Sequence, residues 1–333
     1  MKQTKLDALV FDVDGTLYKN HKLREGVSAL FSEIAKTNIP VIFISGMNTK
    51  ELVCVVSKIE KEAGARLNKC IIASHMGAHV ENYHTSEILL QDLPINAEEI
   101  QKIKKVVNHM APTSILVYRT ENQNYQERPY LDDEKFFRGI KNFIGKQFVG
   151  GLKSLLEKAK VIEFDTEKAK IMQLQRLIED KKVLSVDIIT LSRKKKKITS
   201  QLNGTTPLSV SNGSLIQLSH TSKLKTLEKI CQVCNLNVDN IAYFGDSAND
   251  IECLKRAKVA FATNSTNEEV LKMAIDENLS GKMTYITNSL GDINVIECVT
   301  GNEFDEKKLR EDTYEIAKEQ KIYYVEHTKT KHK

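Results

Sequence analysis

The sequence predicts an α/β fold in which helices cover both faces of a doubly wound parallel sheet. Short apolar runs alternate along the chain with segments of helical periodicity, such as Val27 to Ile34 and Glu51 to Glu62. Asp12, Ser45 and Asp246 stand at the ends of three of these runs, where ligands bind in such sheets. The runs that we assign to strands are residues 8–11, 39–44, 70–73, 241–244, 259–262 and 283–287.

A long middle segment interrupts this alternation and predicts an inserted α+β domain. The chain of 333 residues is long enough for two domains. We assign residues 1–83 and 220–300 to the core, 84–219 to the inserted domain, and 301–333 to a C-terminal helical extension and tail. An inserted domain beside a site can act as a cap that excludes water and selects substrates. The helices expected in the cap are Ala97–His109, Glu134–Ile144 and Glu167–Ile178.

Composition favours a protein that works in the cytoplasm and not in a membrane. No apolar stretch approaches the roughly 18 residues that span a bilayer. Six cysteines in a chain of this length do not suggest a disulfide framework, so we expect free thiols. Cys231 and Cys234 form a C-x-x-C inside an expected helix, where ordinary packing is favoured over a metal or redox role because no second pair follows at zinc spacing.

The net charge of +5 comes from one short segment. Arg193 to Lys197 are five consecutive basic residues, and without them 44 basic residues face 44 acidic ones. The flanking residues, 186–191 and 198–202, suggest strands, so we expect the basic run at the tip of a hairpin. A solvated loop is the favoured interpretation, with contact to an anionic substrate or partner as the alternative. We expect no nucleic-acid partner.

Two aspartates, Asp12 and Asp14, stand directly after the first apolar run and before Gly15. They face the same side if the chain stays extended. Turn formation is one explanation of an Asp-Gly segment. Repulsion of about 4 kcal/mol at 4 Å, with an effective dielectric near 20, favours instead a site that holds a cation. A hard metal ion with oxygen ligands fits such a pair.

Four motifs in order resemble those of the haloacid dehalogenase superfamily, whose members mostly transfer phosphoryl groups through an aspartyl-phosphate. The first is Phe11–Leu17. Three others follow in the expected order, and three of the four begin where an apolar run stops. These later motifs are Ser45–Gly46, Thr221–Lys223 and Gly245–Asp250.

The resemblance extends over most of residues 7–300 and points to the Cof-type, class IIB branch. The second and third motifs, at Ser45 and Lys223, are far apart in the sequence, and that branch inserts its large cap between the same two motifs. The resemblance also implies a Rossmann-like core. Two positions depart from the branch: Met47 replaces a frequent Arg, and His75-Met76-Gly77 replaces a frequent Asn-Gly. Both positions normally face the substrate in that branch, so these departures concern substrate identity more than the chemistry.

The resemblance also implies roles for individual residues. Asp12 would be the nucleophile and Asp14 the general acid and base. Mg2+ would be the cofactor, held by oxygen ligands. The expected metal-binding residues are Asp12, Asp14 through its backbone carbonyl, Asp246 and Asp250. The expected phosphate-binding residues are Ser45, Gly46, Lys223 and Asn249.

These features predict a magnesium-dependent phosphatase that acts on phosphate monoesters of small metabolites, such as sugar phosphates. A phosphomutase of the phosphomannomutase type is one alternative, because the opening motif is similar there. A non-catalytic binding or regulatory protein on the same fold is another. A metal site at His75, His79 and His84 is also conceivable, although their segment suggests a strand and turn, with His75 nearer the active-site entrance.

Overall fold

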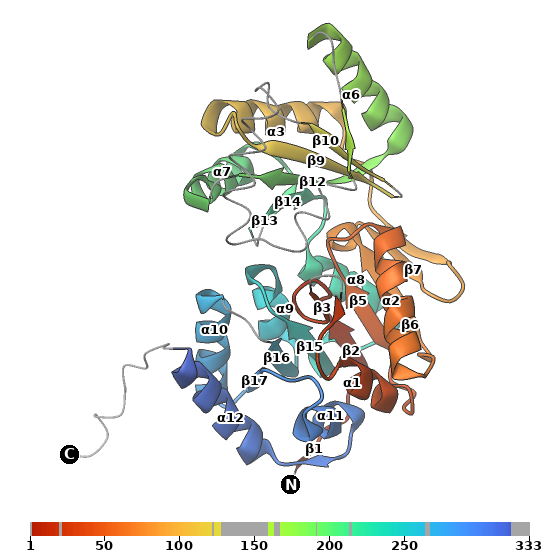
Figure 1. The fold of residues 1–333 in the computed structure, drawn as a ribbon, viewed down its shortest axis with the longest axis vertical. Coiled ribbons are helices and arrows are strands. Elements are labelled where there is room, and N and C mark those ends of the chain that lie inside the picture. Colours follow the sequence, from red (N-terminus) through yellow and green to blue (C-terminus); the bar gives the residue numbers. More distant parts are fainter. Residues whose placement is uncertain are drawn as a thin grey trace, which may run out of the picture.

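The computed structural model consists of a core and an inserted cap (Figure 1). It describes residues 2–19, 22–121, 123–127, 159–162, 167–190, 192–212, 215–263 and 267–320. The predicted fold class, a doubly wound core with an α+β insertion, is confirmed. The helix expected at Glu134–Ile144 lies outside the described residues.

An eight-stranded sheet forms the centre of the core. Its first six strands are parallel, and the last two turn back antiparallel. All six expected strands are present. In spatial order the strands are β17 (Met283–Thr287), β16 (Val259–Thr263), β15 (Ile241–Gly245), β2 (Ala8–Phe11), β5 (Val41–Ile44), β6 (Cys70–Ser74), β7 (His79–Asn82) and β8 (Ile88–Gln91).

Strand β2 lies at the switch point of this sheet. The chain leaves β2 toward β5 on one side and later returns to its other side as β15. Connections therefore diverge from the carboxyl end of β2, which leaves a crevice there for a ligand. Asp12 directly follows β2, and Asp246 directly follows β15.

Helices cover both faces of the sheet because successive strand residues point to opposite faces. Leu9 and Phe11 pack with one set of helices, whereas Ala8 and Val10 pack with the other. None of the helices in the described part of the chain is long and apolar enough to cross a membrane. The first set is α1 (Val27–Ile34), α2 (Thr49–Ala63) and α11 (Ile293–Thr300), and the second is α8 (Lys223–Val233), α9 (Ile251–Arg256) and α10 (Glu268–Leu279).

A row of aromatic rings crosses the sheet just below the strand ends. Phe43, Phe11, Phe244, Phe261 and Tyr285 are paired in register on adjacent strands. The ring centroids of Phe11 and Phe244 are 4.5 Å apart, and those of Phe244 and Phe261 are 4.7 Å apart. Stacked pairs of this kind add to the energy of burial. Stacking along this row therefore helps to hold the adjacent strands in register, so that the strand ends that carry the site stay level with one another.

Phe244→Ala is expected to lower the free energy of unfolding by about 3–5 kcal/mol, because it leaves a cavity between two stacked rings. Urea unfolding would measure this loss. Ile293→Ala is the matched control, since Ile293 is 60% exposed and its truncation removes little packing. Equal midpoints for the two variants would contradict a structural role for the aromatic row.

The cap is a second sheet with helices on one face. Alternation along its strands is clear: Leu116 and Tyr118 join the apolar cluster under the helices, whereas Val117 and Arg119 point to the other face. Its strands in order are β11 (Lys160–Val161), β10 (Asn124–Glu127), β9 (Ile115–Thr120), β12 (Val183–Ile189), β14 (Ile216–Ser219) and β13 (Ser209–Asn212), and its helices are α3 (Ala97–Met110), α6 (Glu167–Lys181) and α7 (Ser192–Thr205).

The basic run Arg193–Lys197 lies in helix α7, so the predicted hairpin is wrong at this place. Ile198 and Leu202 are the reason. They are spaced four residues apart, lie on one face of a helix and are both buried in the cap cluster. The lysines before them have high helix propensity and carry no strand pattern of their own.

Three elements near the expected domain boundaries pack on the core. Strand β8 pairs with β7, so the core sheet continues to Gln91. Helix α12 (Glu306–Glu319) contacts β17, and the Thr313 hydroxyl accepts a hydrogen bond from the Ile286 amide at 3.1 Å. Strand β18 (Glu303–Phe304) pairs with β1 (Lys2–Gln3) near the N-terminus. We therefore propose that the core includes residues up to 91 and the helix after residue 300.

Candidate active site

Asp12 is a buried carboxylate at the carboxyl end of the central strand. Its backbone N–H donates to the Phe244 carbonyl at 2.9 Å, so the pairing of β2 with β15 extends to this residue. The side chain is 5% exposed. The Asp12 Oδ2 atom has no hydrogen-bond partner among the described residues. A buried carboxylate oxygen without a partner is costly unless a ligand or a cation occupies the space beside it.

Gly15 allows the first motif to fold back against Asp246. Its φ angle is +89°, which favours glycine, and a Cβ at this position would clash with the Asp246 carboxylate. The Arg24 guanidinium donates to the Gly15 carbonyl at 2.8 Å and fixes the turn. The turn thus brings the loops after β2 and β15 into direct contact.

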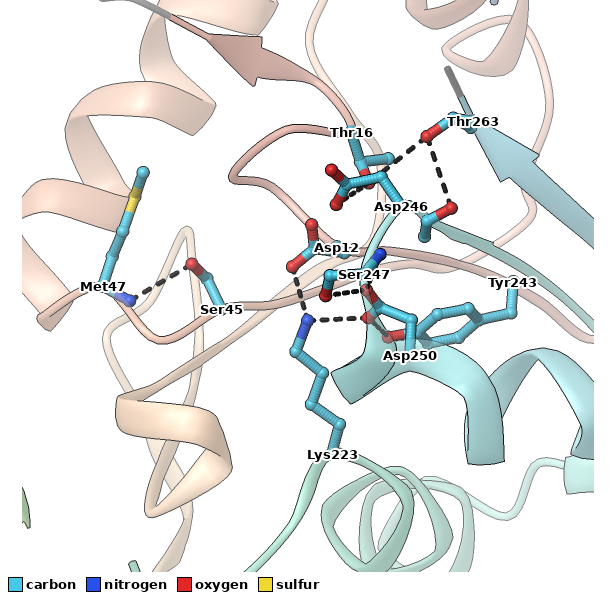
Figure 2. Close-up of polar contacts among 11 residues, drawn as sticks. Asp12, Thr16, Ser45, Met47, Lys223, Tyr243, Asp246, Ser247, Asp250 and Thr263 are labelled. Carbon is cyan, nitrogen blue, oxygen red and sulfur yellow. Dashed lines mark hydrogen bonds and ion pairs between the residues drawn. The ribbon is translucent and has the colours of Figure 1, made fainter. Parts of the chain in front are cut away.

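Lys223 links the first and fourth motifs. It is the first residue of α8, and its Nζ donates to Asp12 Oδ1 at 2.5 Å and to Asp250 Oδ1 at 2.7 Å. All three side chains are at least 95% buried. Figure 2 shows the ammonium between the two carboxylates. Removing this one cation would leave two buried negative charges without compensation.

Asp250 is saturated with hydrogen bonds, as Figure 2 also shows. The Tyr243 hydroxyl donates to its Oδ1 at 2.8 Å. The Ser247 hydroxyl and backbone N–H donate to its Oδ2 at 2.8 and 3.1 Å. Asp250 therefore holds Lys223 in place while its own two oxygens are occupied. Sequence reasoning missed Tyr243, although a tyrosine inside an apolar strand, three residues before Asp246 and seven before Asp250, is a visible signal.

Burial and mutual repulsion raise the pKa values of the acids in this cluster. Burial raises the pKa of Asp12 well above its usual range, and Asp250 and Asp246 add to the shift while Lys223 opposes it. Burial and the Asp250 carboxylate raise the pKa of Asp246 to about 7. Burial alone would lower the pKa of Lys223, but Asp12 and Asp250 raise it above its usual value. The cluster thus holds more negative charge than its lysine offsets.

The donor set fits a divalent cation that prefers oxygen. Ligand oxygens of Asp12, Asp246 and Asp250 all lie within 4.8 Å of one another. When all three acids are ionised, their charge and that of the Lys223 ammonium sum to −2, which a divalent cation would neutralise. Oxygen-only ligands with carboxylate charge are the environment that Mg2+ takes in proteins.

Asp14 does not share the buried space of Asp12. Its side chain is exposed and lies outside the group of three carboxylates. Asp14 pairs by an isolated bridge with Tyr18, because the chain has already begun to turn at Gly15. Its charge nevertheless acts on Asp246, so it lies at the rim of the same site. The sequence suggested that Asp12 and Asp14 lie close together. In the structure the carboxylates close to Asp12 are instead those of Asp246 and Asp250.

The other expected phosphate-binding residues surround the same strand ends. Ser45 follows β5, is fully buried, and its hydroxyl accepts the Met47 N–H at 3.2 Å (Figure 2). Asn249 lies in the turn that carries Asp250, and its buried Oδ1 has no partner among the described residues. Gly46 lies beside Ser45, under the cap. The structure thus brings together groups from all four motifs.

A comparison of the sequence with models of protein families identifies the family of this chain. Residues 9–278 match the model of the haloacid dehalogenase-like hydrolases. The chain belongs to this family. No curated protein sequence matches the chain.

Solved structures share the fold of this hydrolase at low sequence identity. A subclass IIB sugar phosphatase of the superfamily has a TM-score of 0.57 and 16% identity, over 80% of this chain and 91% of that chain. A phosphatase of the superfamily from Bacteroides thetaiotaomicron has a TM-score of 0.60 and 15% identity, over 96% of both chains. A haloacid dehalogenase-like hydrolase from B. subtilis has a TM-score of 0.59 and 16% identity, over 80% of this chain and 92% of that chain.

The cap of the hydrolase presents a polar group to the active site that sequence reasoning missed. Arg119 Nε donates to Asp187 Oδ2 at 2.7 Å, and Gln217 Nε2 donates to Asp187 Oδ1 at 3.2 Å. A Cβ on Gly46 would lie 2.6 Å from Gln217 Nε2, so the cap amide sits directly over the second motif. The signal in the sequence is weak: Asp187 and Gln217 each lie between two apolar residues, whereas Arg119 lies between Tyr118 and Thr120.

Electrostatics also place Arg119 near the rim of the site. Burial alone would lower its pKa, but Asp187 outweighs burial and raises the pKa above its usual value, with smaller effects from Glu51 and Asp14. Glu51 and Asp14 belong to the core, so this cap side chain lies within electrostatic range of helix α2 and of the loop after β2. We call Arg119, Asp187 and Gln217 the cap triad.

His75 lies in a strained turn under the cap and not at an open entrance. It is fully buried, and His75 and Met76 have φ angles of +54° and +61°. Burial, and then Arg119 and His79, lower the pKa of His75 to about 3. His79 bonds to Glu81 at 2.9 Å, and His84 bonds to the Leu67 carbonyl at 2.6 Å. Among the described residues the histidines do not form a metal cluster.

The C-x-x-C pair has the environment of ordinary packing. Cys231 is buried, Cys234 is half-buried, and both thiols are free. Burial raises the pKa of Cys231 to about 11 and also raises that of Cys234. Protonated thiols at neutral pH are poor metal ligands and poor nucleophiles.

Proposed function

We propose that this hydrolase is a magnesium-dependent phosphatase that cleaves phosphate monoesters of small metabolites through an aspartyl-phosphate on Asp12. The observation that carries the proposal is the buried cluster of three carboxylates bridged by Lys223 at the switch point of the sheet. Such a cluster destabilises the fold unless it serves a ligand, because buried like charges repel.

The first half-reaction is an in-line attack of the Asp12 carboxylate on phosphorus. An oxygen–phosphorus bond forms at Asp12 while the ester oxygen–phosphorus bond breaks, and the leaving oxygen takes a proton from Asp14. Its position at the exposed rim suits Asp14 to this role, because the leaving group must depart toward solvent. The general acid has to be protonated at this moment.

The second half-reaction returns the enzyme to its starting state. Asp14, now a carboxylate, takes a proton from a water molecule that attacks phosphorus. The bond between phosphorus and Asp12 breaks, and inorganic phosphate leaves. Splitting hydrolysis into two displacements makes each step easier than direct attack on the ester.

Four residues hold the phosphoryl group during both steps. Lys223 offsets negative charge beside Asp12, the Ser45 hydroxyl and the Gly46 backbone serve as hydrogen-bond donors, and the Asn249 side chain is free to reorient toward an oxygen. Preorganised donors around a transferring phosphoryl group stabilise the transition state without reorganisation.

Asp12, Asp246 and the Asp14 backbone carbonyl would hold Mg2+, with Asp250 supporting the site through Lys223. The bound ion would supply positive charge that lowers the repulsion between the carboxylates and the phosphate. The −2 charge of the cluster and the partnerless Asp12 Oδ2 support this assignment.

The chemistry of the cap triad favours a substrate whose leaving group carries several hydroxyl groups, as in sugar phosphates. Arg119 and Asp187 form a neutral pair, so the triad does not favour a second phosphate. Its amide and guanidinium groups offer donors and an acceptor for hydroxyl groups. The ring of Tyr118 packs into the apolar cluster on the opposite face, and Tyr125 packs against that cluster, so neither ring is placed to stack on a nucleobase.

Phosphate release from a panel of metabolites, with and without Mg2+, tests the proposal. We expect turnover of sugar phosphates only with the cation. Mg2+ should also raise Tm by several degrees, because a ligand at 100 times its Kd stabilises a protein by about 2.7 kcal/mol. Asp246→Asn should weaken this thermal shift. If Mg2+ produced neither turnover nor a thermal shift, the result would favour a non-catalytic protein on this fold. Transfer of the phosphate between two positions of the substrate would indicate a mutase.

Gln217→Leu is expected to lower kcat/KM on the preferred sugar phosphate about tenfold, the cost of one lost hydrogen bond in a desolvated site. Hydrolysis of p-nitrophenyl phosphate, whose leaving group has no hydroxyl for the triad, should change little. Steady-state kinetics on both substrates give the comparison. An equal loss on both would show that Gln217 serves the closed fold and not the leaving group.

A further inference from the structure

A basic groove crosses the cap on the face away from the active site. It has a volume of about 1110 Å3 and lies between α3 and α7. The apolar cluster of the cap lies between these helices and the sheet. The cap triad alternates with cluster residues along the strands, so it lies on the other face of the sheet. The groove is therefore separate from the catalytic chemistry. Its basic lining residues are Lys102 and Lys105 on α3 and Arg193, Lys194 and Lys197 on α7.

The residues that line the groove carry positive charge and include no acidic side chain. Its lining holds five lysine and arginine side chains and no aspartate or glutamate. Arg193 and Lys197 are four residues apart on α7, and Lys102 and Lys105 are three apart on α3, so like charges are adjacent on each helix. The first turn of α7 contains no acid that would complement the helix dipole. This arrangement costs stability in the free protein.

Two of the five cations already have a partner inside the protein. Lys102 forms an ion pair with Glu98 at 2.8 Å, and Lys194 donates to the Met110 carbonyl at 2.7 Å. Lys105, Arg193 and Lys197 are exposed, and the described part of the structure contains no ion pair for them. These three charges are available to an anion.

The remaining lining residues discriminate among anionic partners. Val106 and Met110 place apolar surface in the groove, which a phosphodiester backbone would not use. The lining has no Phe, Tyr or Trp on which a base could stack. A concave groove between two helices also fits a chain segment better than a flat lipid surface. The two helices that form its walls have 14 residues each and are about 21 Å long.

We propose that the α3–α7 groove binds an acidic peptide segment of a partner protein, with carboxylates at Lys105, Arg193 and Lys197 and an apolar side chain over Val106 and Met110. Other grooves between helices bind amphipathic segments in a similar way, with apolar side chains in the groove and charged side chains at its rim. It gives the basic run a role that the hydrolytic site leaves open, and it does not depend on the proposed phosphatase activity.

Fluorescence anisotropy with a labelled synthetic peptide of glutamate and leucine residues tests the proposal. We expect one peptide to bind per chain, with an affinity that falls as salt rises. The groove variant Lys105→Ser/Arg193→Ser/Lys197→Ser should bind about tenfold more weakly, since each exposed charge pair contributes modestly. The control variant Lys61→Ser/Lys69→Ser/Lys272→Ser removes the same charge from exposed core positions and should bind like the wild type.

Three further probes test the charge requirement and compare this partner with other polyanions. A peptide with glutamine in place of glutamate should not bind, and labelled single-stranded RNA and phosphatidylserine vesicles should bind more weakly than the acidic peptide. Circular dichroism and turnover, both expected to be unchanged in the groove variant, exclude misfolding as the cause. The proposal is overturned if the wild type does not bind the acidic peptide at low salt, if the groove and control variants bind equally, or if RNA or vesicles bind more tightly.

Discussion

Asp12→Asn is expected to abolish turnover, with a loss on the order of 10^4-fold or more, because an amide is a far poorer nucleophile than a carboxylate. The substitution keeps the shape of the side chain and can still accept the hydrogen bond from Lys223. It should therefore leave the fold intact, which circular dichroism would check. Phosphate release under saturating Mg2+ gives the measurement, so that weaker cation binding does not imitate the loss of the nucleophile.

A matched Asp14→Asn variant distinguishes the two acids. It keeps the nucleophile but removes the group that gives and takes the proton, so both half-reactions should slow and neither should vanish. Beryllium fluoride, a mimic of the phosphoryl group, should inhibit the wild type with Mg2+ and should not be retained by Asp12→Asn. A chiral phosphate ester should give net retention, since two displacements each invert phosphorus. Net inversion, or full activity of Asp12→Asn, would falsify the covalent mechanism.

The sequence predicts the core well because its signals are local. An apolar run of four to six residues followed by a polar residue marks a buried strand and its carboxyl end, and the order of such runs is enough to indicate the sheet. Asp12, Lys223 and Asp250 lie far apart in the chain, yet each occupies a strand end or a helix start. Their meeting at one cluster follows from that placement.

Some side chains have a role only because they contact another helix, strand or loop, and the local sequence does not predict these contacts. Arg119 and Gln217 look like ordinary polar positions on strands until the cap closes over Gly46. Tyr243 was assigned only to a strand, and its bond to Asp250 depends on the turn that follows. The basic run was misassigned because consecutive lysines carry no hydrophobic period, and only Ile198 and Leu202 reveal the helix.

Lys223→Met is the second substitution with a large expected effect, on turnover and on stability together. The side chain is 96% buried between two carboxylates, so its loss leaves uncompensated charges in the core. Removing one partner of a buried ion pair costs about 3–5 kcal/mol, and turnover should fall by several orders of magnitude because the phosphate also loses its cation.

A second substitution separates these two effects of Lys223. Adding Asp250→Asn to Lys223→Met removes one of the stranded negative charges while an amide oxygen can still accept from Tyr243. Urea unfolding in a chelator should therefore show part of the stability restored in the double variant, because the charge imbalance falls by one. Turnover should stay lost, because no cation returns to the phosphate. Recovery of both would mean that Lys223 serves only to balance Asp250, and near-wild-type turnover of Lys223→Met would remove it from the phosphate site.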